Sequence, residues 1–131
     1  MKVLIDSDAL FALYVANDFH HKSAKQILDK FLKEGAELFV TNLVLQETAT
    51  VISYRLGHNQ SLNFLKRFLQ INIQQIFIGK NLNTKSWSVF KKQSKKGTSF
   101  VDCANLAVTV ELKINKIFSF DQFYQKTGFK I

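Results

Sequence analysis

The sequence predicts a three-layer α/β/α fold with a mostly parallel sheet of about five strands. Short apolar runs alternate with longer segments of helical periodicity, and this alternation is typical of βαβ units. The first run, residues 3–5, has three consecutive apolar residues, as expected for a strand buried on both faces. The chain has 131 residues without a linker or an internal repeat, so we expect one domain spanning residues 1–131.

Two helices are expected after the first strand. Residues 9–16 are almost entirely apolar and predict a short buried helix, which Asn17 and Asp18 end. Residues 21–33 carry apolar side chains at helical spacing, and Gly35 follows them as a C-terminal cap. Both helices therefore precede the second strand in the chain.

The second strand, residues 38–40, is also expected to lead into two helices. Thr41 is a suitable N-cap for a helix that runs to Leu56 and stops at Gly57. A further helix is expected at 59–70. The apolar residues on one face of this helix are Leu62, Leu65, Phe68 and Leu69.

The last third of the chain continues the alternation. A third strand is expected at 76–78, where Gly79 ends it, followed by a helix at 82–93. A basic polar loop leads to a helix at 99–112, which Ser99 opens. The remaining expected elements are a strand at 117–118, a helical turn at 121–126 and a short strand at 129–131.

Composition narrows the cellular setting and the class of partner. The 18 Lys and Arg residues outnumber the 10 Asp and Glu residues, and the net charge of +8 favours a polyanionic partner such as nucleic acid. The one cysteine, Cys103, excludes an internal disulfide and is consistent with a reducing cytoplasm. No apolar run is long enough to span a bilayer, and the start does not resemble a signal peptide, so we expect no membrane association.

Two acids, Asp6 and Asp8, follow the first strand. The carboxyl ends of parallel strands lie along one edge of a sheet, and ligands of open α/β folds bind at that edge. Asp6 is therefore a candidate functional residue at the rim of the sheet. The alternative is structural, because Asp6 or Ser7 can simply cap the following helix.

Glu47 interrupts an apolar stripe on its expected helix. Its helical neighbours are Leu43, Val44, Val51 and Tyr54, and this stripe should face the sheet. A carboxylate in that position is costly unless it is paired or bound to a metal. Alternatively, Glu47 lies at the edge of the stripe and reaches solvent, or pairs with a lysine.

Asp102 and Asp121 each have a local explanation as well. Ser99 and Asp102 fit a capping box, and Asp121 suits the start of a helix. However, all these acids follow a strand or begin a helix at the same expected edge. Carboxylates that converge without a cation repel one another, and oxygen-only clusters are the sites that Mg²⁺ or Mn²⁺ prefers.

The acidic motifs follow one another along essentially the whole chain. They are Asp6-Ser7-Asp8-Ala9-Leu10, Thr41-Asn42-Leu43-Val44-Leu45-Gln46-Glu47, Ser99-Phe100-Val101-Asp102, Phe118-Ser119-Phe120-Asp121-Gln122-Phe123 and Gly128-Phe129. In this order and spacing, the chain resembles the PIN-domain nucleases, and more narrowly the VapC-like ribonuclease toxins of toxin–antitoxin pairs. The resemblance implies a metal-dependent endoribonuclease, with an antitoxin and a second copy of the chain as expected partners.

The resemblance also implies roles for individual residues. Asp6, Glu47, Asp102 and Asp121 would be the catalytic, metal-binding acids. We expect Asp6 and Asp102 to bind Mg²⁺ or Mn²⁺ directly, and Glu47 and Asp121 to bind directly or through water. The possible accessory residues are Asp8, Thr98 and Ser99.

A basic loop lies just before Asp102 and carries Lys91, Lys92, Lys95 and Lys96. We expect this loop to guide the RNA backbone toward the acids. The alternative is a solvated charged loop with no ligand.

Three rival functions remain open from the sequence. Asp6 and Asp8 after a strand also resemble the nucleophile and acid of haloacid-dehalogenase-like phosphatases, although the late acidic pair of those enzymes is missing here. A PIN-domain endonuclease of RNA processing would need no antitoxin. A catalytically silent RNA- or protein-binding module of the same fold is the non-enzymatic alternative.

Overall fold

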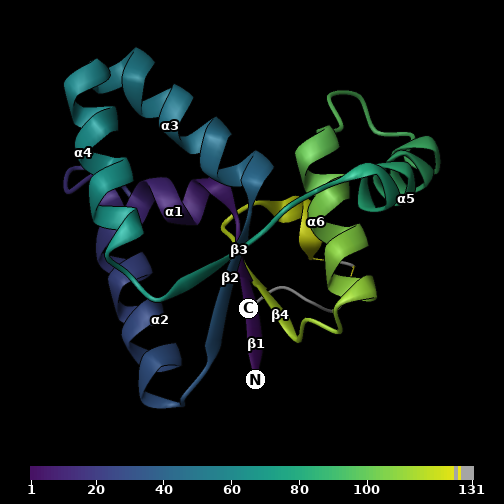
Figure 1. Ribbon diagram of the computed structural model, residues 1–131, viewed down its shortest axis with the longest axis horizontal. Coiled ribbons are helices and arrows are strands. Elements are labelled where there is room, and N and C mark those ends of the chain that lie inside the picture. The colour runs from purple at the N-terminus through teal and green to yellow at the C-terminus, as the bar shows by residue number, and fades with distance from the viewer. Residues whose placement is uncertain (126, 128–131) are drawn as a thin grey trace.

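A parallel sheet of four strands divides the helices into two groups (Figure 1). The computed structural model describes residues 1–125 and 127. The strand order is β3-β2-β1-β4, and all neighbouring pairs are parallel. The strands are β1 (Lys2–Ile5), β2 (Glu37–Thr41), β3 (Ile73–Ile76) and β4 (Lys116–Phe118). The strand expected at 129–131 lies outside the described residues.

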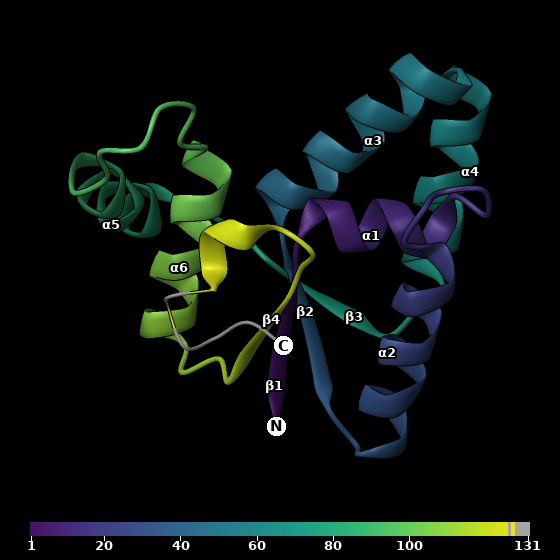
Figure 2. The same ribbon diagram turned by 180° about the vertical axis from the view of Figure 1, so that it is seen from behind.

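The helices form the two outer layers, and this confirms the predicted three-layer α/β/α architecture (Figures 1 and 2). One layer contains α1 (Ser7–Tyr14), α2 (His21–Lys33), α3 (Asn42–Leu56) and α4 (His58–Leu69). The other contains α5 (Lys80–Lys91) and α6 (Phe100–Glu111). A short 3₁₀ helix, η1 (Gln122–Tyr124), stands where a helical turn was expected at 121–126.

The central strand β1 is buried on both faces, as predicted. Val3 and Ile5 pack into a large apolar cluster with residues of the α1–α4 layer, whereas Leu4 faces the α5–α6 side beside Val108. The side chains of Val3, Leu4 and Ile5 are all fully buried. Burial on both faces therefore anchors the strand that carries Asp6 at its end.

The third strand runs over Ile73–Ile76, so the expected range of 76–78 was wrong. Its register pairs Thr41 of β2 with Ile76, and β2 ends at Thr41 because α3 begins at the next residue. The residues after Ile76 therefore have no β2 residue left to pair with. Phe77 is 67% exposed, and the Ile78 N–H donates to the Asn42 side chain instead.

The inward face of α4 also differs from the expected one. Ser61, Phe64 and Phe68 are its buried residues. Of the expected face, Leu62, Leu65 and Leu69 are 52%, 39% and 69% exposed. Packing against α3 turns α4 so that these leucines point outward. We call Leu62, Leu65 and Leu69 the α4 outer face.

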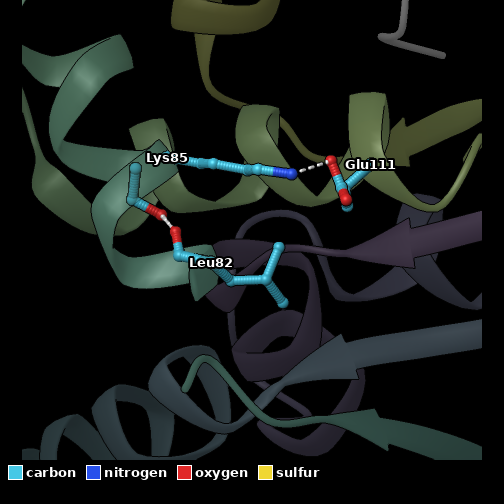
Figure 3. A network of polar contacts seen from close by, with 4 residues as sticks. Leu82, Lys85 and Glu111 are labelled. Carbon is cyan, nitrogen blue, oxygen red and sulfur yellow. Dashed lines mark hydrogen bonds and ion pairs between the residues drawn. The ribbon is translucent and has the colours of Figure 1, made fainter. Parts of the chain in front are cut away.

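Helix α5 packs along α6 and so supports the helix that carries Asp102. The Trp87 ring lies 4.4 Å from the Phe100 ring, centroid to centroid. Figure 3 shows the polar contacts at this junction, where Lys85 Nζ lies 2.5 Å from Glu111 Oε2. Among the described residues, none of the helices is both long enough and apolar enough to cross a bilayer.

Candidate metal centre

The predicted acids lie on elements that meet at the carboxyl edge of the sheet. Asp6 follows β1, and Asp121 follows β4, the strand that pairs with β1 (Figure 2). Asp102 lies in the first turn of α6, and Glu47 lies in α3. The parallel topology therefore brings residues from both ends of the chain to one rim.

Asp6 is a buried carboxylate whose two oxygens both accept hydrogen bonds. Asp6 is the N-cap of α1, as the alternative interpretation of this residue predicted, and its Oδ1 accepts the Ser7 N–H at 2.8 Å. The same oxygen accepts from Asn105 Nδ2 at 3.0 Å, and Oδ2 accepts from Ser119 Oγ at 3.0 Å. Only 2% of Asp6 is exposed, so the cap explains one of these contacts and not the burial of the charge.

Burial raises the pKa of Asp6 from 3.8 to about 7, and the charges of Asp8 and then Asp102 add to the rise. Burial also raises the pKa of Asp102, to about 6, and the charges of Asp121, Glu47 and Asp8 contribute further. The charges of neighbouring acids thus contribute to the raised pKa of Asp6 and of Asp102. Sites where burial and like charges combine in this way are candidates for function.

Ser119 ties Asp6 to Asp8. Its hydroxyl lies 3.0 Å from Asp6 Oδ2 and 3.2 Å from Asp8 Oδ1, and it accepts the Asp121 N–H at 3.0 Å. Asp8 also accepts the Phe120 N–H at 3.0 Å. These contacts connect the start of α1 to the segment after β4. Burial raises the pKa of Asp8 as well.

Asp102 makes one backbone contact and one side-chain contact. Its backbone N–H donates to Ser99 Oγ at 3.4 Å, so Ser99 is the N-cap of α6, as predicted. Its carboxylate accepts from Tyr124 Oη at 3.0 Å. The Asp102 carboxylate is therefore not the group that caps α6.

Glu47 is half-buried at the edge of the inward face of α3. The buried residues of this helix are Val44, Leu45, Thr48 and Ile52, whereas Tyr54 is 89% exposed. The expected stripe through Tyr54 was therefore wrong, because α3 also packs on α4 and α1, and the packing rotates its inward face. Glu47 lines a cleft of about 240 Å³ whose other lining residues include Asp8, His20 and Arg55.

Asp121 is exposed, and its carboxylate caps η1 by accepting the Phe123 N–H at 2.8 Å. The helix-start alternative is thus correct for this contact, although the charge of Asp121 still raises the pKa of Asp102.

The loop before α6 has one local hydrogen bond from a candidate accessory residue: the Thr98 hydroxyl donates to the Lys95 carbonyl at 2.6 Å. The exposed lysines of the basic loop are Lys91, Lys92, Lys95 and Lys96.

Sequence reasoning missed three residues of the site: Ser119, Asn105 and Tyr124. Asn105 is a polar residue in an otherwise apolar helix, one turn after Asp102, and this signal could have identified it. Burial, and then the charges of Asp6 and Asp102, raise the pKa of Tyr124, so its phenol stays protonated and can donate.

The side chains present fit a hard divalent cation. All candidate ligands are carboxylate oxygens, which Mg²⁺ and Mn²⁺ favour. Among the described residues, the one ion pair joins Lys85 to Glu111. It involves none of the candidate acids, so no ion pair there neutralises their negative charge. Within the same residues, no three Asp, Glu, His or Cys side chains are already arranged to hold one ion.

The chain is similar to known nucleases over nearly its whole length. A family model of the PIN domain matches residues 3–130. A VapC ribonuclease of Archaeoglobus fulgidus is 32% identical over 124 residues, which cover 92% of this chain and 78% of that protein. The 23S rRNA-specific endonuclease VapC20 of Mycobacterium tuberculosis is 24% identical over 127 residues, covering 97% and 95%.

Two solved structures share the fold. The crystal structure of Mycobacterium tuberculosis VapC20, a toxin that cleaves the sarcin–ricin loop, matches with a TM-score of 0.83 at 23% identity and covers 97% of this chain and 95% of that one. The structure of VapBC2 from Rickettsia felis, bound to a DNA fragment from their promoter, matches with a TM-score of 0.74 at 13% identity and covers 97% and 92%.

Proposed function

Because the chain belongs to the PIN-domain family, we propose that it is a metal-dependent endoribonuclease and the toxin of a toxin–antitoxin pair. The observation that carries this proposal is the pair of acids at the carboxyl edge of the sheet, buried Asp6 and half-buried Asp102. Burial and the neighbouring carboxylates raise the pKa of both acids, and a bound cation would relieve that repulsion.

Mg²⁺ or Mn²⁺ is the proposed cofactor. Asp6 and Asp102 would hold the ion directly, while Glu47 and Asp121 would bind it directly or through water. When bound, such an ion lowers the pKa of a water and neutralises charge that develops on phosphate oxygens. Asp8 would support this set through its contact with Ser119.

Glu47 is the residue best placed to orient the attacking water. It lines the open cleft together with Asp8, and its charge also acts on half-buried Asp102. A carboxylate there can accept a proton as the water attacks phosphorus in line with the leaving oxygen. Thr98 and Ser99 would support this edge by fixing the loop and the first turn of α6.

Basic and aromatic side chains next to the acids support RNA as the substrate. Arg55 lines the same cleft as Glu47 and can contact a phosphate. The His20 ring stacks on the Phe120 ring with centroids 4.1 Å apart, and exposed Phe19 makes a T-shaped contact with the His20 ring. Aromatic rings of this kind are stacking platforms for single-stranded bases. The basic loop would contact the backbone of the strand.

The proposed antitoxin would bind the apolar groove between α1, α2 and α4. This groove of about 210 Å³ is lined by apolar side chains that include Leu13, Leu28 and Phe68, and it also contains Lys25 and Arg67. A partner segment with apolar and acidic side chains would complement it. An RNA-processing endonuclease would have no such partner, so inhibition and co-purification by the product of an adjacent small reading frame distinguish the two.

We further propose that the chain acts in the cytoplasm and forms a homodimer. The α4 outer face supports the homodimer, because it is a group of exposed leucines on one helix.

The deciding experiment is an RNA-cleavage assay with Mn²⁺ or Mg²⁺ and with EDTA. Wild type should cleave RNA only with the metal, and Asp6→Asn and Asp102→Asn should abolish cleavage. Asp29→Asn, which changes an exposed acid of α2, is the matched control and should cleave normally. Thermal unfolding of each variant checks that a loss of cleavage does not come from a loss of folding.

Each rival function predicts a different result. Cleavage that survives Asp6→Asn would refute the assigned acids. A phosphoaspartate trapped on Asp6 would favour the phosphatase. RNA binding without cleavage under any metal condition would favour the silent module.

A further inference from the structure

Two fully buried side chains that the proposed reaction does not use connect Asp6 to Asp102. Asn105 Nδ2 donates to Asp6 Oδ1 and to Tyr124 Oη, both at 3.0 Å. Tyr124 Oη in turn donates to Asp102 Oδ1 at 3.0 Å. Neither Asn105 nor Tyr124 is exposed at all. A continuous run of hydrogen bonds thus joins the end of β1, the helix α6 and η1.

The hydrogens in this run have one consistent arrangement. Around a cation Asp6 is ionised and its Oδ1 can only accept, so Asn105 must present its amide N–H₂ to it rather than its oxygen. Both amide hydrogens are then used, and the one phenol hydrogen of Tyr124 goes to Asp102. Two neutral donors therefore orient two carboxylates without cancelling their charge. A lysine or arginine in the same position would compete with a cation.

The oxygen of the Asn105 amide supports the same conclusion. Asn105 Oδ1 is buried and has no hydrogen-bond partner within the described part of the chain. A buried carbonyl oxygen without a partner destabilises a fold, and such exceptions are concentrated at functional sites. Packing alone would favour an apolar residue here. Its place in the core is best explained by its two N–H donors.

We propose that Asn105 and Tyr124 are positioning residues that set the separation and orientation of the Asp6 and Asp102 carboxylates for a divalent cation. The inference rests on the proposed function, since it takes these two acids as metal ligands. Partners that orient ligands from outside the coordination sphere commonly control metal affinity. The C-terminal segment that carries Tyr124 thereby becomes part of the metal site without contributing a ligand.

Tyr124→Phe is the most direct test, because it removes one oxygen and keeps the ring. Mn²⁺ affinity is measured by isothermal titration calorimetry, without RNA. We expect Tyr124→Phe to weaken Mn²⁺ binding by about 10- to 100-fold. Tyr14→Phe is the matched control, because Tyr14 Oη donates to the Gln60 backbone carbonyl at the other end of α1, and this variant should bind Mn²⁺ like wild type.

A double-mutant cycle tests whether the two residues form one link. Asn105→Ala breaks the same connection at its other end, so the double variant with Tyr124→Phe should bind Mn²⁺ no more weakly than the worse single variant. If the two substitutions acted independently, their fold-losses in Mn²⁺ affinity would instead multiply in the double variant. Thermal unfolding in EDTA checks that each variant is folded before its affinity is compared. The KM for RNA should remain unchanged while the Mn²⁺ concentration needed for cleavage rises.

The outcomes separate this inference from the proposed function. Equal Mn²⁺ affinity of wild type and Tyr124→Phe would overturn the positioning role and leave the ribonuclease function standing. A wild-type chain that binds Mn²⁺ but cleaves no RNA would contradict the ribonuclease function, while a weaker Tyr124→Phe would still support the link. A wild-type chain without measurable Mn²⁺ binding would overturn both.

Discussion

Asp6 places a carboxylate where water cannot reach it and where other carboxylates repel it. Within the described part of the chain, hydrogen bonds but no ion pair reach Asp6, so the ionised form is disfavoured in the metal-free protein. Burial raises the pKa of Asp102 in the same way. The unfolded chain has no such environment, so the protonation of these residues couples the stability of the fold to pH.

The free energy of unfolding of the metal-free protein should therefore fall as pH rises. Between 3.8 and about 7, Asp6 is protonated in the folded state but ionised in the unfolded state, so each increase in pH favours unfolding across that window. Thermal unfolding in EDTA over this pH range measures the effect. Adding Mn²⁺ on the alkaline side of the window should restore much of the lost stability.

Asp6→Asn is the control for this prediction, because an amide does not titrate. The variant should show a shallower fall in melting temperature over the same pH range. A wild-type melting temperature that stays level from the acidic to the alkaline end of the window would contradict the assigned protonation.

The loop between α5 and α6 combines two roles at the scale of the element. Thr98 and Ser99 bind backbone groups and so define where α6 starts. The loop crosses near the N-terminal end of α6, where the helix carries Asp102 (Figure 1). Its lysines are all exposed and are therefore free to meet a phosphate backbone. The N-terminal end of α6 and the charged loop therefore both lie beside Asp102.

Replacing Lys95 and Lys96 with alanine should raise the KM for RNA and weaken its dependence on salt. Each phosphate contact that is lost should lower the slope of log affinity against log salt by about 1. The control is the double alanine variant of Lys30 and Lys33, which are equally exposed but lie on α2. Identical salt slopes for the two double variants would show that the loop is only a solvated surface.

At the scale of the whole molecule, the α4 outer face is an apolar surface that no described part of the chain covers. Leu65→Lys should convert the proposed homodimer to a monomer, as measured by light scattering of the eluting protein. Leu32→Lys is the control, because Leu32 is also exposed, at 54%, but lies on α2. A wild-type chain that elutes as a monomer at all concentrations would exclude the dimer.

The topology explains how much of the site could be predicted from the sequence. Asp6 ends a buried strand and Asp102 begins a helix, and in a parallel sheet those positions share one rim whatever the details of packing. Ser119 and Tyr124 could not be recognised in this way, because their partners lie on elements distant in the chain. The shift of β3 and the rotation of α4 had the same origin, since register and packing against neighbours fix them rather than local periodicity.

The position of β4 beside β1 has a consequence for synthesis. Asp6 is synthesised well before Asn105 and Ser119, which bond to it, and before Tyr124, which bonds to Asn105. While these later residues are still inside the exit tunnel, Asp6 cannot meet its partners, however much of the earlier chain has folded. The proposed metal centre would therefore form only after the segment that carries Tyr124 has emerged.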